Sequence, residues 1–258
     1  MAQVHPTAVV ESGARLAADV EVGAHAFVGP EVELSSGVIL LPHAVVTGRT
    51  QIGERTRVHS FAALGSSPQN RSFEGEAMGL AIGSNNVIRE NVTIHVGTAE
   101  GGGRTRIGND NYLMNGAHVG HDCQVGSGCV IASFSGLAGH VTVEDHAVLG
   151  AYTGVHQFAR VGESAMSASN AKLSRNAPPF SLVAGDRARL MGLNHVGLAR
   201  RGFSRPTRDA LRHAFHLLFR SKLLLALAIE RTRDELGSVP EVERLVEFLE
   251  TSERGFCR

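Results

Sequence analysis

An aliphatic residue at every sixth position is the feature that most constrains how this chain folds. From Val4 to Leu64, every position at this spacing is Val, Leu or Ile. The same phase resumes at Ile82, and the pattern restarts one residue out of step at Ile107 and continues to Val161. A period of six fits neither the 3.6-residue period of an α-helix nor the two-residue period of an alternating strand. It predicts a parallel β-helix built from short strands.

The repeat also predicts which residues are neighbours. Each aliphatic residue should point into a narrow interior, and the glycine that often follows it permits a tight corner. Three hexads make one triangular coil, so residues 18 apart should stack on successive coils. The expected fold is mainly β, with a β-helix at 1–190 followed by a C-terminal α-helical domain at 191–258. Helical spacing of apolar residues predicts helices that open at Ser204, that span Lys222 to Leu236, and that open at Ser238.

Two segments interrupt the hexads. The first, at 66–81, is polar and rich in turn formers, and the second, at 98–105, is rich in glycine. Long loops on a regular scaffold are often functional. We expect the first loop to reach a binding site, and we interpret the second as a solvated connection.

Charge and composition exclude several classes of protein. Lys and Arg number 25 and Asp and Glu also number 25, so the overall charge does not favour nucleic acid or a membrane surface. The longest apolar run, Leu223 to Ile229, is far shorter than the ~20 residues that span a bilayer. The three cysteines lack the CxxC spacing of zinc or redox sites, and the N-terminus has no secretory pattern. We therefore expect a cytoplasmic protein without a membrane-inserted segment.

Five histidines gather in the segment from Leu113 to Gly162: His118, His121, His140, His146 and His156. The 18-residue spacing places Gly139 and then Gln157 beside His121, with His140 and His156 one position away. It likewise places Gly136 and Gly154 beside His118. An imidazole base with polar neighbours and an open backbone N–H suits acyl transfer. His121 is the best candidate base, because Asp122 follows it and can set its tautomer.

Two other functions fit the same pattern. Trimeric β-helix carbonic anhydrases bind zinc through three histidines, and His118 and His121 could share a metal with His140 or with a histidine of a neighbouring subunit. A β-helix can also be a scaffold without catalytic activity. The remaining histidines, His146 among them, are interpreted as ordinary surface or core residues.

Four motifs carry a more specific resemblance: HVGHDCQVG at 118–126, LAGHVTV at 137–143, GVHQF at 154–158 and GLARRGFSR at 197–205. Together they resemble the bacterial UDP-N-acetylglucosamine acyltransferases that begin lipid A synthesis, and the resemblance covers nearly the whole chain. It implies a left-handed coil and a homotrimer with active sites between subunits. It also implies transfer of a 3-hydroxyacyl group from acyl carrier protein to the sugar 3-position, with no metal or redox cofactor.

The resemblance assigns roles to individual residues. His121 matches the general base of the family, and Gly139 supplies the amide that stabilises the oxyanion. The substrate site is implied to contain Gln69, Asn70, His95, His118, His140, His156 and Gln157, and the nucleotide is implied to contact Asn194, Arg200 and Arg201.

This chain departs from the family pattern in two places. The family carries Gln, Asp and, two places later, Lys in the polar loop, whereas this chain has Gln69-Asn70-Arg71-Ser72. A sugar with a 3-amino group therefore becomes a possible acceptor. Where many members have a Gly-Gly pair, this chain has Ala168 and Ser169, near Met166, which predicts an acyl pocket for a shorter chain.

The segment from Arg187 to Lys222 is strongly basic. It contains nine Arg or Lys residues and a single acidic residue, Asp209, in a chain whose net charge is zero. We interpret this segment as a docking surface for an acidic carrier protein and a diphosphate, against the alternative of a solvated helix face.

Overall fold

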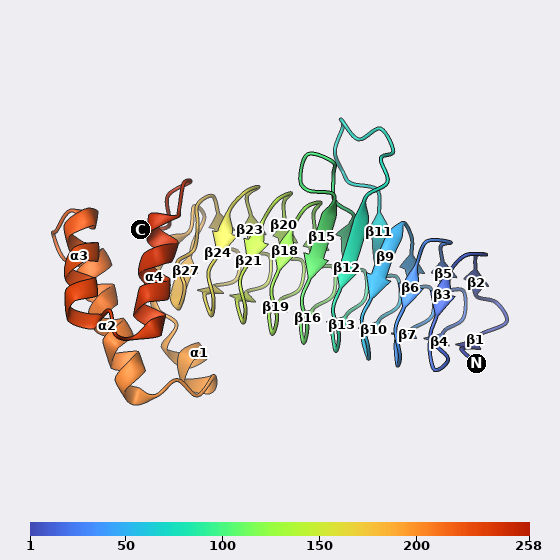
Figure 1. Cartoon of the computed structure of the whole chain (residues 1–258), viewed down its shortest axis with the longest axis horizontal. Coiled ribbons are helices and arrows are strands. Elements are labelled where there is room, and N and C mark those ends of the chain that lie inside the picture. The colour runs from blue at the N-terminus through green and yellow to red at the C-terminus, as the bar shows by residue number, and fades with distance from the viewer.

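The computed structural model, which describes residues 1–258, confirms the predicted β-helix. The chain winds into a long three-sided coil of short parallel strands, and four helices lie at its C-terminal end (Figure 1). Each coil contributes one strand to each of three sheets. Strands pair in register with the next coil, so that Val130 pairs with Val148 and Gly136 with Gly154. Residues 18 apart therefore stack as the repeat predicts.

The three sheets form the three faces of the coil. The first sheet contains β1 (Gln3–Val4), β4 (Glu21–Val22), β7 (Ile39–Leu40), β10 (Arg57–Val58), β13 (Val87–Ile88), β16 (Tyr112–Leu113), β19 (Val130–Ile131), β22 (Val148–Leu149), β25 (Met166–Ser167), β27 (Ser181–Ala184) and β28 (Arg189–Leu193). The second contains β2 (Val9–Val10), β5 (Phe27–Val28), β8 (Val45–Val46), β11 (Ala63–Ser66), β14 (Thr93–His95), β17 (His118–Val119), β20 (Gly136–Leu137), β23 (Gly154–Val155) and β26 (Lys172–Leu173). The third contains β3 (Arg15–Leu16), β6 (Glu33–Leu34), β9 (Arg49–Ile52), β12 (Gly79–Ile82), β15 (Arg104–Ile107), β18 (Gln124–Val125), β21 (Thr142–Val143) and β24 (Arg160–Val161).

The hexad residues form the core. Leu113, Ile131 and Leu149, stacked on three successive coils, are fully buried. Burying each such side chain contributes about 1.5–3 kcal/mol, and the sum along the stack stabilises the fold. The first coil is the exception, because no coil covers its outer end, and Val4 is 43% exposed there.

Corners between strands place residues in the left-handed backbone region, which non-glycine residues rarely adopt. His25, His43 and Phe61 have φ values of 56°, 63° and 63° at the corner between the first and second sheets. Their rings stack, with centroids 5.0 Å apart for both neighbouring pairs. Stacking along the edge offsets part of the backbone cost at each corner.

Both predicted loops leave the coil, and Figure 1 shows them projecting from the same side. The first lies between Ser66, where β11 ends, and Gly79, where β12 begins, and the second lies between His95 and Arg104. They contact each other, since the N–H of Gly79 donates to the carbonyl of Gly103 at 2.9 Å. The two loops therefore lie side by side where they leave the coil, between the second and third sheets.

The C-terminal part contains α1 (His195–Arg200), α2 (Arg205–Phe219), α3 (Leu225–Leu236) and α4 (Pro240–Glu250). Ser204 caps α2 as predicted, because its Oγ accepts a hydrogen bond from the N–H of Thr207. The helix expected from Lys222 begins only at Leu225. The antiparallel pairing of β27 with β28 is a feature that the hexads do not predict. None of the helices is long and apolar enough to cross a membrane.

Candidate active site

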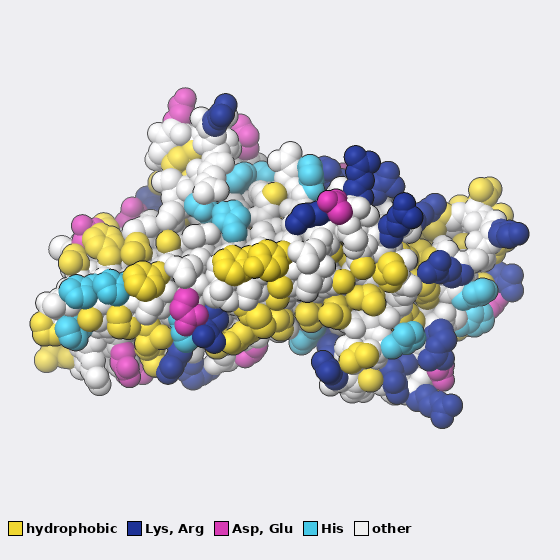
Figure 2. All heavy atoms as spheres, turned by 180° about the vertical axis from the view of Figure 1, so that it is seen from behind, with side chains coloured by type: hydrophobic (Ala, Val, Ile, Leu, Met, Phe, Trp, Pro, Cys, Tyr) yellow, Lys and Arg dark blue, Asp and Glu magenta, His cyan; other side chains and the backbone are white.

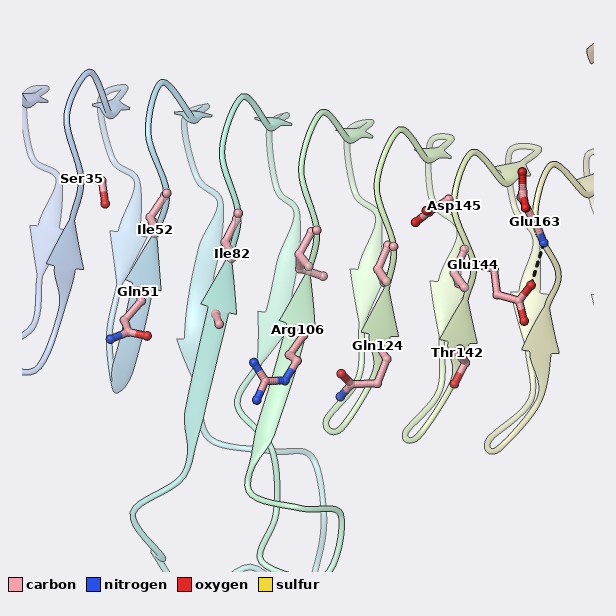
Figure 3. Close-up of a pocket in the computed structure, with 18 of the residues that line it drawn as sticks. Ser35, Gln51, Ile52, Ile82, Arg106, Gln124, Thr142, Glu144, Asp145 and Glu163 are labelled. Carbon is pink, nitrogen blue, oxygen red and sulfur yellow. Dashed lines mark hydrogen bonds between the residues drawn. The ribbon is translucent and has the colours of Figure 1, made fainter. Parts of the chain in front are cut away.

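The largest groove on the coil, with a volume of about 1020 Å³, runs along the third sheet. Figure 3 shows Gln51 on β9, and Arg106, Gln124 and Thr142 on the successive strands β15, β18 and β21 of this face. Its acidic groups are engaged in structural bonds: Glu163 pairs with Arg201 and Arg244, and Glu144 pairs with Arg160. With no imidazole among its lining residues, this groove lacks an evident base for acyl transfer.

A second cavity, of about 650 Å³, lies on the second sheet beneath the first loop. Most of the residues that were predicted to form the substrate site line this cavity. Its lining residues include Gln69, His95, His118, His121, Gly139, His156 and Gln157. Because these residues come from the first loop and from four successive coils, the cavity depends on the stacking register of the β-helix.

His121 lines this cavity and forms a dyad with the buried Asp122. Nδ1 of His121 lies 2.7 Å from Oδ2 of Asp122, whose side chain is fully buried. A carboxylate only accepts, so Nδ1 carries the proton and Nε2 is left free to act as a base. Burial raises the pKa of Asp122, but hydrogen bonds from His121 and Thr98 outweigh this effect and hold the pKa below its usual value. Asp122 therefore remains charged beside the imidazole.

Gly139 lies directly under the His121 ring. A Cβ atom at position 139 would be 2.6 Å from Nε2 of His121, so any side chain there would displace the imidazole. The Gly139 N–H has no acceptor among the backbone bonds of the chain. A free N–H beside an imidazole base is the arrangement that stabilises a tetrahedral oxyanion.

His118 and His95 form a second histidine pair at the side of the cavity. Their ring centroids are 5.3 Å apart, Nδ1 of His118 lies 2.8 Å from Oγ1 of Thr93, and Nδ1 of His95 lies 2.7 Å from the carbonyl oxygen of Ser67. Burial, together with the charge of His95, lowers the pKa of His118 below 6.5. His118 is therefore neutral at neutral pH and can donate or accept a single hydrogen bond.

His140 and His156 lie at the edges of the site. The His140 ring meets the His121 ring edge-on, with centroids 5.1 Å apart, and stacks on Phe158. Its Nε2 lies 3.7 Å from Oδ2 of Asp122, so it neighbours the dyad without lining the cavity. His156 is exposed at the cavity wall, where Nη2 of Arg254 approaches its Nδ1 at 3.4 Å.

Other predicted residues lie outside this cavity. Met166, Asn194, Arg200 and Arg201 line a separate cavity of about 630 Å³ between the first sheet and α1. The side chain of Asn70 turns back into its own loop, where Oδ1 accepts from the N–H of Ser72 at 3.0 Å. Ala168 and Ser169 line neither cavity.

The sequence interpretation missed two parts of the site. Lys172 and Ser174 line the cavity, and Lys172 pairs in register with Gly154. Continuing the column of His118, Gly136 and Gly154 by another 18 residues would have identified Lys172. The second loop was taken for a solvated connection, but Thr98 in that loop is buried and bonds to Asp122.

His121, Asp122 and His140 form a cluster of the kind that can hold a metal ion. Their ligand atoms all lie within 4.8 Å of one another. Oδ2 of Asp122, however, already accepts from His121 and from the hydroxyl of Thr98. The donors present fit a hydrogen-bonded carboxylate better than a metal ligand, and we derive no metal-dependent step.

Comparisons with known proteins agree with this geometry. Residues 177–257 match the family model described as UDP N-acetylglucosamine O-acyltransferase, domain 2, and residues 104–139 match bacterial transferase hexapeptide repeats. The acyl-[acyl-carrier-protein]–UDP-N-acetylglucosamine O-acyltransferase of Thermodesulfovibrio yellowstonii is 41% identical over 258 residues, which is 100% of both chains. Two solved structures each cover 99% of both chains: LpxA from Acinetobacter baumannii (37% identity, TM-score 0.96) and the UDP-N-acetylglucosamine acyltransferase from Campylobacter jejuni (38%, 0.94).

Proposed function

The chain belongs to the UDP-N-acetylglucosamine O-acyltransferase family, whose members use acyl carrier protein as donor in lipid A biosynthesis, and we propose that His121 and Gly139 carry out its transfer step. Its coil is accordingly the left-handed β-helix of hexapeptide acyltransferases. The observation that carries the proposal is the His121–Asp122 dyad, whose free Nε2 lies against the backbone of Gly139.

The reaction follows from this arrangement. Nε2 of His121 removes the proton from the sugar 3-hydroxyl while the hydroxyl oxygen attacks the thioester carbon of the 3-hydroxyacyl donor. The Gly139 N–H stabilises the resulting oxyanion, and charged Asp122 stabilises the imidazolium. The carbon–sulfur bond then breaks, and the proton passes from His121 to the departing thiolate. The products are an ester and the free thiol of the carrier.

Substrate contacts are assigned to the residues around the dyad. Gln69, His95, His118, His156 and Gln157 line the cavity and are proposed to hold the sugar and the donor, with His140 supporting the dyad from behind. Asn194, Arg200 and Arg201 are proposed to contact the nucleotide. This assignment is supported by their cationic and amide side chains around one cavity beside α1.

A homotrimer brings the two cavities together. Residues that point outward on the first and second sheets are largely apolar, such as Val87, Val130 and Val148 on the first and Phe27 and Val45 on the second. Outward residues of the third sheet are polar or charged. We place the edge between the first two sheets at the threefold axis, where Figure 2 shows rows of hydrophobic and histidine side chains. The His121 cavity of one subunit then faces the Arg200 cavity of the next.

Acyl carrier protein is proposed to dock on the basic helical part of the chain. The nine basic residues between Arg187 and Lys222 occupy β28, α1, α2 and their connections. Dark blue side chains gather over this half of the molecule (Figure 2). Such a surface complements an acidic carrier and accelerates its association.

A 3-amino analogue of the sugar is the second candidate acceptor. Oδ1 of Asn70 is engaged by Ser72, so the group that it can offer a ligand is its amide N–H, a donor. Either a hydroxyl oxygen or the lone pair of an amine can accept from such a donor, so Asn70 leaves both acceptors open, and transfer to the amine would yield an amide. Mass spectrometry of the products from UDP-N-acetylglucosamine and its 3-amino analogue, offered together, identifies the preferred acceptor.

We also propose an acyl chain shorter than the longest that the family uses. Ala168 and Ser169 add side-chain atoms where many members have glycines, and Met166 lies close by in sequence. Each methylene that is left unburied costs only ~0.8 kcal/mol, so the preference should be graded along a donor series. Highest turnover with the longest donor would contradict this assignment.

The alternatives receive less support. The relatives that cover the whole chain are acyltransferases, which does not favour a metal-dependent hydratase or a scaffold without activity. The three cysteines are free and buried, which suits the reducing cytoplasm, where we place the enzyme.

The test of the function replaces His121 by Ala. Transfer should fall by about 10²–10⁴-fold, the range typical for loss of a general base, while the oligomeric state remains unchanged. His5→Ala, at the exposed N-terminal end of the coil, is the matched control and should retain full activity. Wild-type activity in the His121 variant would rule out its role as the base.

A further inference from the structure

The glycine-rich loop between β14 and β15 closes over the dyad. Thr98 in this loop is 7% exposed and contacts both oxygens of the Asp122 carboxylate. The Thr98 N–H donates to Oδ1 at 2.8 Å, and the Thr98 hydroxyl donates to Oδ2 at 2.7 Å. We propose that Thr98 is a positioning residue, which locks the Asp122 carboxylate in the orientation that serves His121. This inference rests on the proposed role of His121 as the base.

The loop is shaped for this contact. A Cβ atom on Gly101 would lie 2.0 Å from Cγ of Asp122, so the backbone passes too close to the carboxylate for any side chain. The N–H of Gly101 donates to Oγ1 of Thr98 at 3.2 Å, and the N–H of Gly103 donates to the carbonyl of Thr98 at 2.8 Å. The Gly103 bond holds the backbone of Thr98, the Gly101 bond occupies an acceptor site of the Thr98 hydroxyl, and the single hydrogen of this hydroxyl is donated to Asp122.

The contacts from Thr98 determine which of two histidines the Asp122 carboxylate bonds to. Oδ2 of Asp122 lies 2.7 Å from Nδ1 of His121 and 3.7 Å from Nε2 of His140, so both imidazoles are near this oxygen. A modest rotation of the carboxylate would exchange one imidazole for the other. Because Thr98 holds both oxygens, and because the N–H of Asp122 donates to Oγ1 of Thr105 at 2.8 Å, the carboxylate stays aligned with His121.

Thr98 also affects the charge that His121 experiences. Its hydroxyl and Nδ1 of His121 share the same oxygen, and each hydrogen bond withdraws negative charge from it. Loss of the hydroxyl should leave more negative charge on that oxygen and strengthen the attraction between Asp122 and the imidazolium that forms during the reaction. The other titratable groups here are His140 and Cys123, and burial raises the pKa of Cys123 to about 12, so the thiol remains protonated.

The experiment compares Thr98→Val, which keeps the shape and removes the hydroxyl, with Thr98→Ser, which keeps the hydroxyl. Thr56→Val is the structural control, since Thr56 is equally buried in the coil and its hydroxyl bonds only to the backbone of Gly83 and Asn86. We expect Thr98→Val to lower kcat by about 10–100-fold, the value of one hydrogen bond to a charged group, with little change in KM.

The acid limb of the kcat/KM profile should also move to higher pH in Thr98→Val. Thr98→Ser should restore both kcat and the profile, while Thr56→Val should lower thermal stability without moving the profile. A folded Thr98→Val variant with the wild-type kcat and profile would overturn the proposal, as would an equal shift in Thr56→Val. If His121→Ala is inactive while Thr98→Val is normal, only the positioning role fails; if His121→Ala is active, the proposed base fails.

Discussion

The imidazole of His121 fills the space that a side chain at Gly139 would occupy. A Cβ atom at position 139 would lie 2.6 Å from both Nε2 and Cε1 of that ring. The two residues belong to neighbouring coils, so the stacking of the β-helix, rather than a local turn, brings them into contact. Because Nε2 accepts the proton in the proposed reaction, the missing side chain of Gly139 determines where the acceptor hydroxyl can lie.

Gly139→Ala should therefore inactivate the enzyme without unfolding it. The added methyl displaces the His121 ring and shifts the N–H that stabilises the oxyanion, so kcat should fall by about 10²–10³-fold. Steady-state kinetics and thermal melting measure the two effects separately. Gly192→Ala is the control, because a Cβ atom there meets nothing within 4 Å. Comparable kcat values in both variants would argue against the role of Gly139.

The stacking in this site could be predicted because the repeat is strict. The spacing of 18 placed Gly139 beside His121 and Gly136 and Gly154 beside His118, and the register pairs confirm the second column. An interior filled mostly by aliphatic residues leaves little freedom in register, since a shift by one residue would move the outward polar side chains into it. Because of the same regularity, the fold class could be predicted without knowing the structure of the loops.

The contacts between the repeat and its interruptions could not be predicted in this way. Thr98 and Asp122 are 24 residues apart, across a loop whose path no periodicity describes. Arg201 was expected to be available to a nucleotide, yet its Nη1 lies 2.9 Å from Oε1 of Glu163, a residue 38 positions earlier. Such pairs depend on the path of the chain in the loops and in the helical part. The six-residue pattern does not extend to these segments and therefore cannot predict their contacts.

Burial of His118 predicts a dependence of stability on pH. Because its pKa in the folded state lies below 6.5, the unfolded chain binds more protons when the pH falls below 6.5, and the free energy of unfolding then decreases. The loss continues until the pH reaches the folded pKa. In His118→Gln this contribution is absent, so the difference between the two proteins should change with pH only below 6.5. Denaturant titrations across this range measure it, and curves that stay parallel would contradict the prediction.

Lys172 should attract an anionic part of a substrate. Its alkyl chain crosses Gly154, with Cδ 3.3 Å from the Cβ position of that glycine, and Nζ donates to the carbonyl of Tyr152 at 3.1 Å. The ammonium thus stands at the wall of the His121 cavity, where a phosphate can approach. We expect Lys172→Met to raise KM for the UDP-sugar or the acyl carrier by about 3–10-fold with little change in kcat, and the effect should shrink at high salt. Arg15→Met, at the far end of the coil, should change neither constant.

Glu163 should orient the Arg201 side chain for its proposed contact with the nucleotide. Its side chain is 12% exposed and binds Arg201 from the segment after α1 and Arg244 from α4, so one carboxylate joins two helical segments to the coil. Removing its charge in Glu163→Gln weakens the bonds to both guanidinium groups, so Arg201, which keeps its contact with Ser164, is held less firmly at the proposed nucleotide cavity. KM for the UDP-sugar should rise several-fold while kcat is largely preserved, because the dyad lies in another cavity. Glu33→Gln, which removes an exposed pair with Arg15, is the matched control, since surface pairs contribute only ~0–1 kcal/mol. A fall in kcat at unchanged KM would show instead that Glu163 acts on the transfer step.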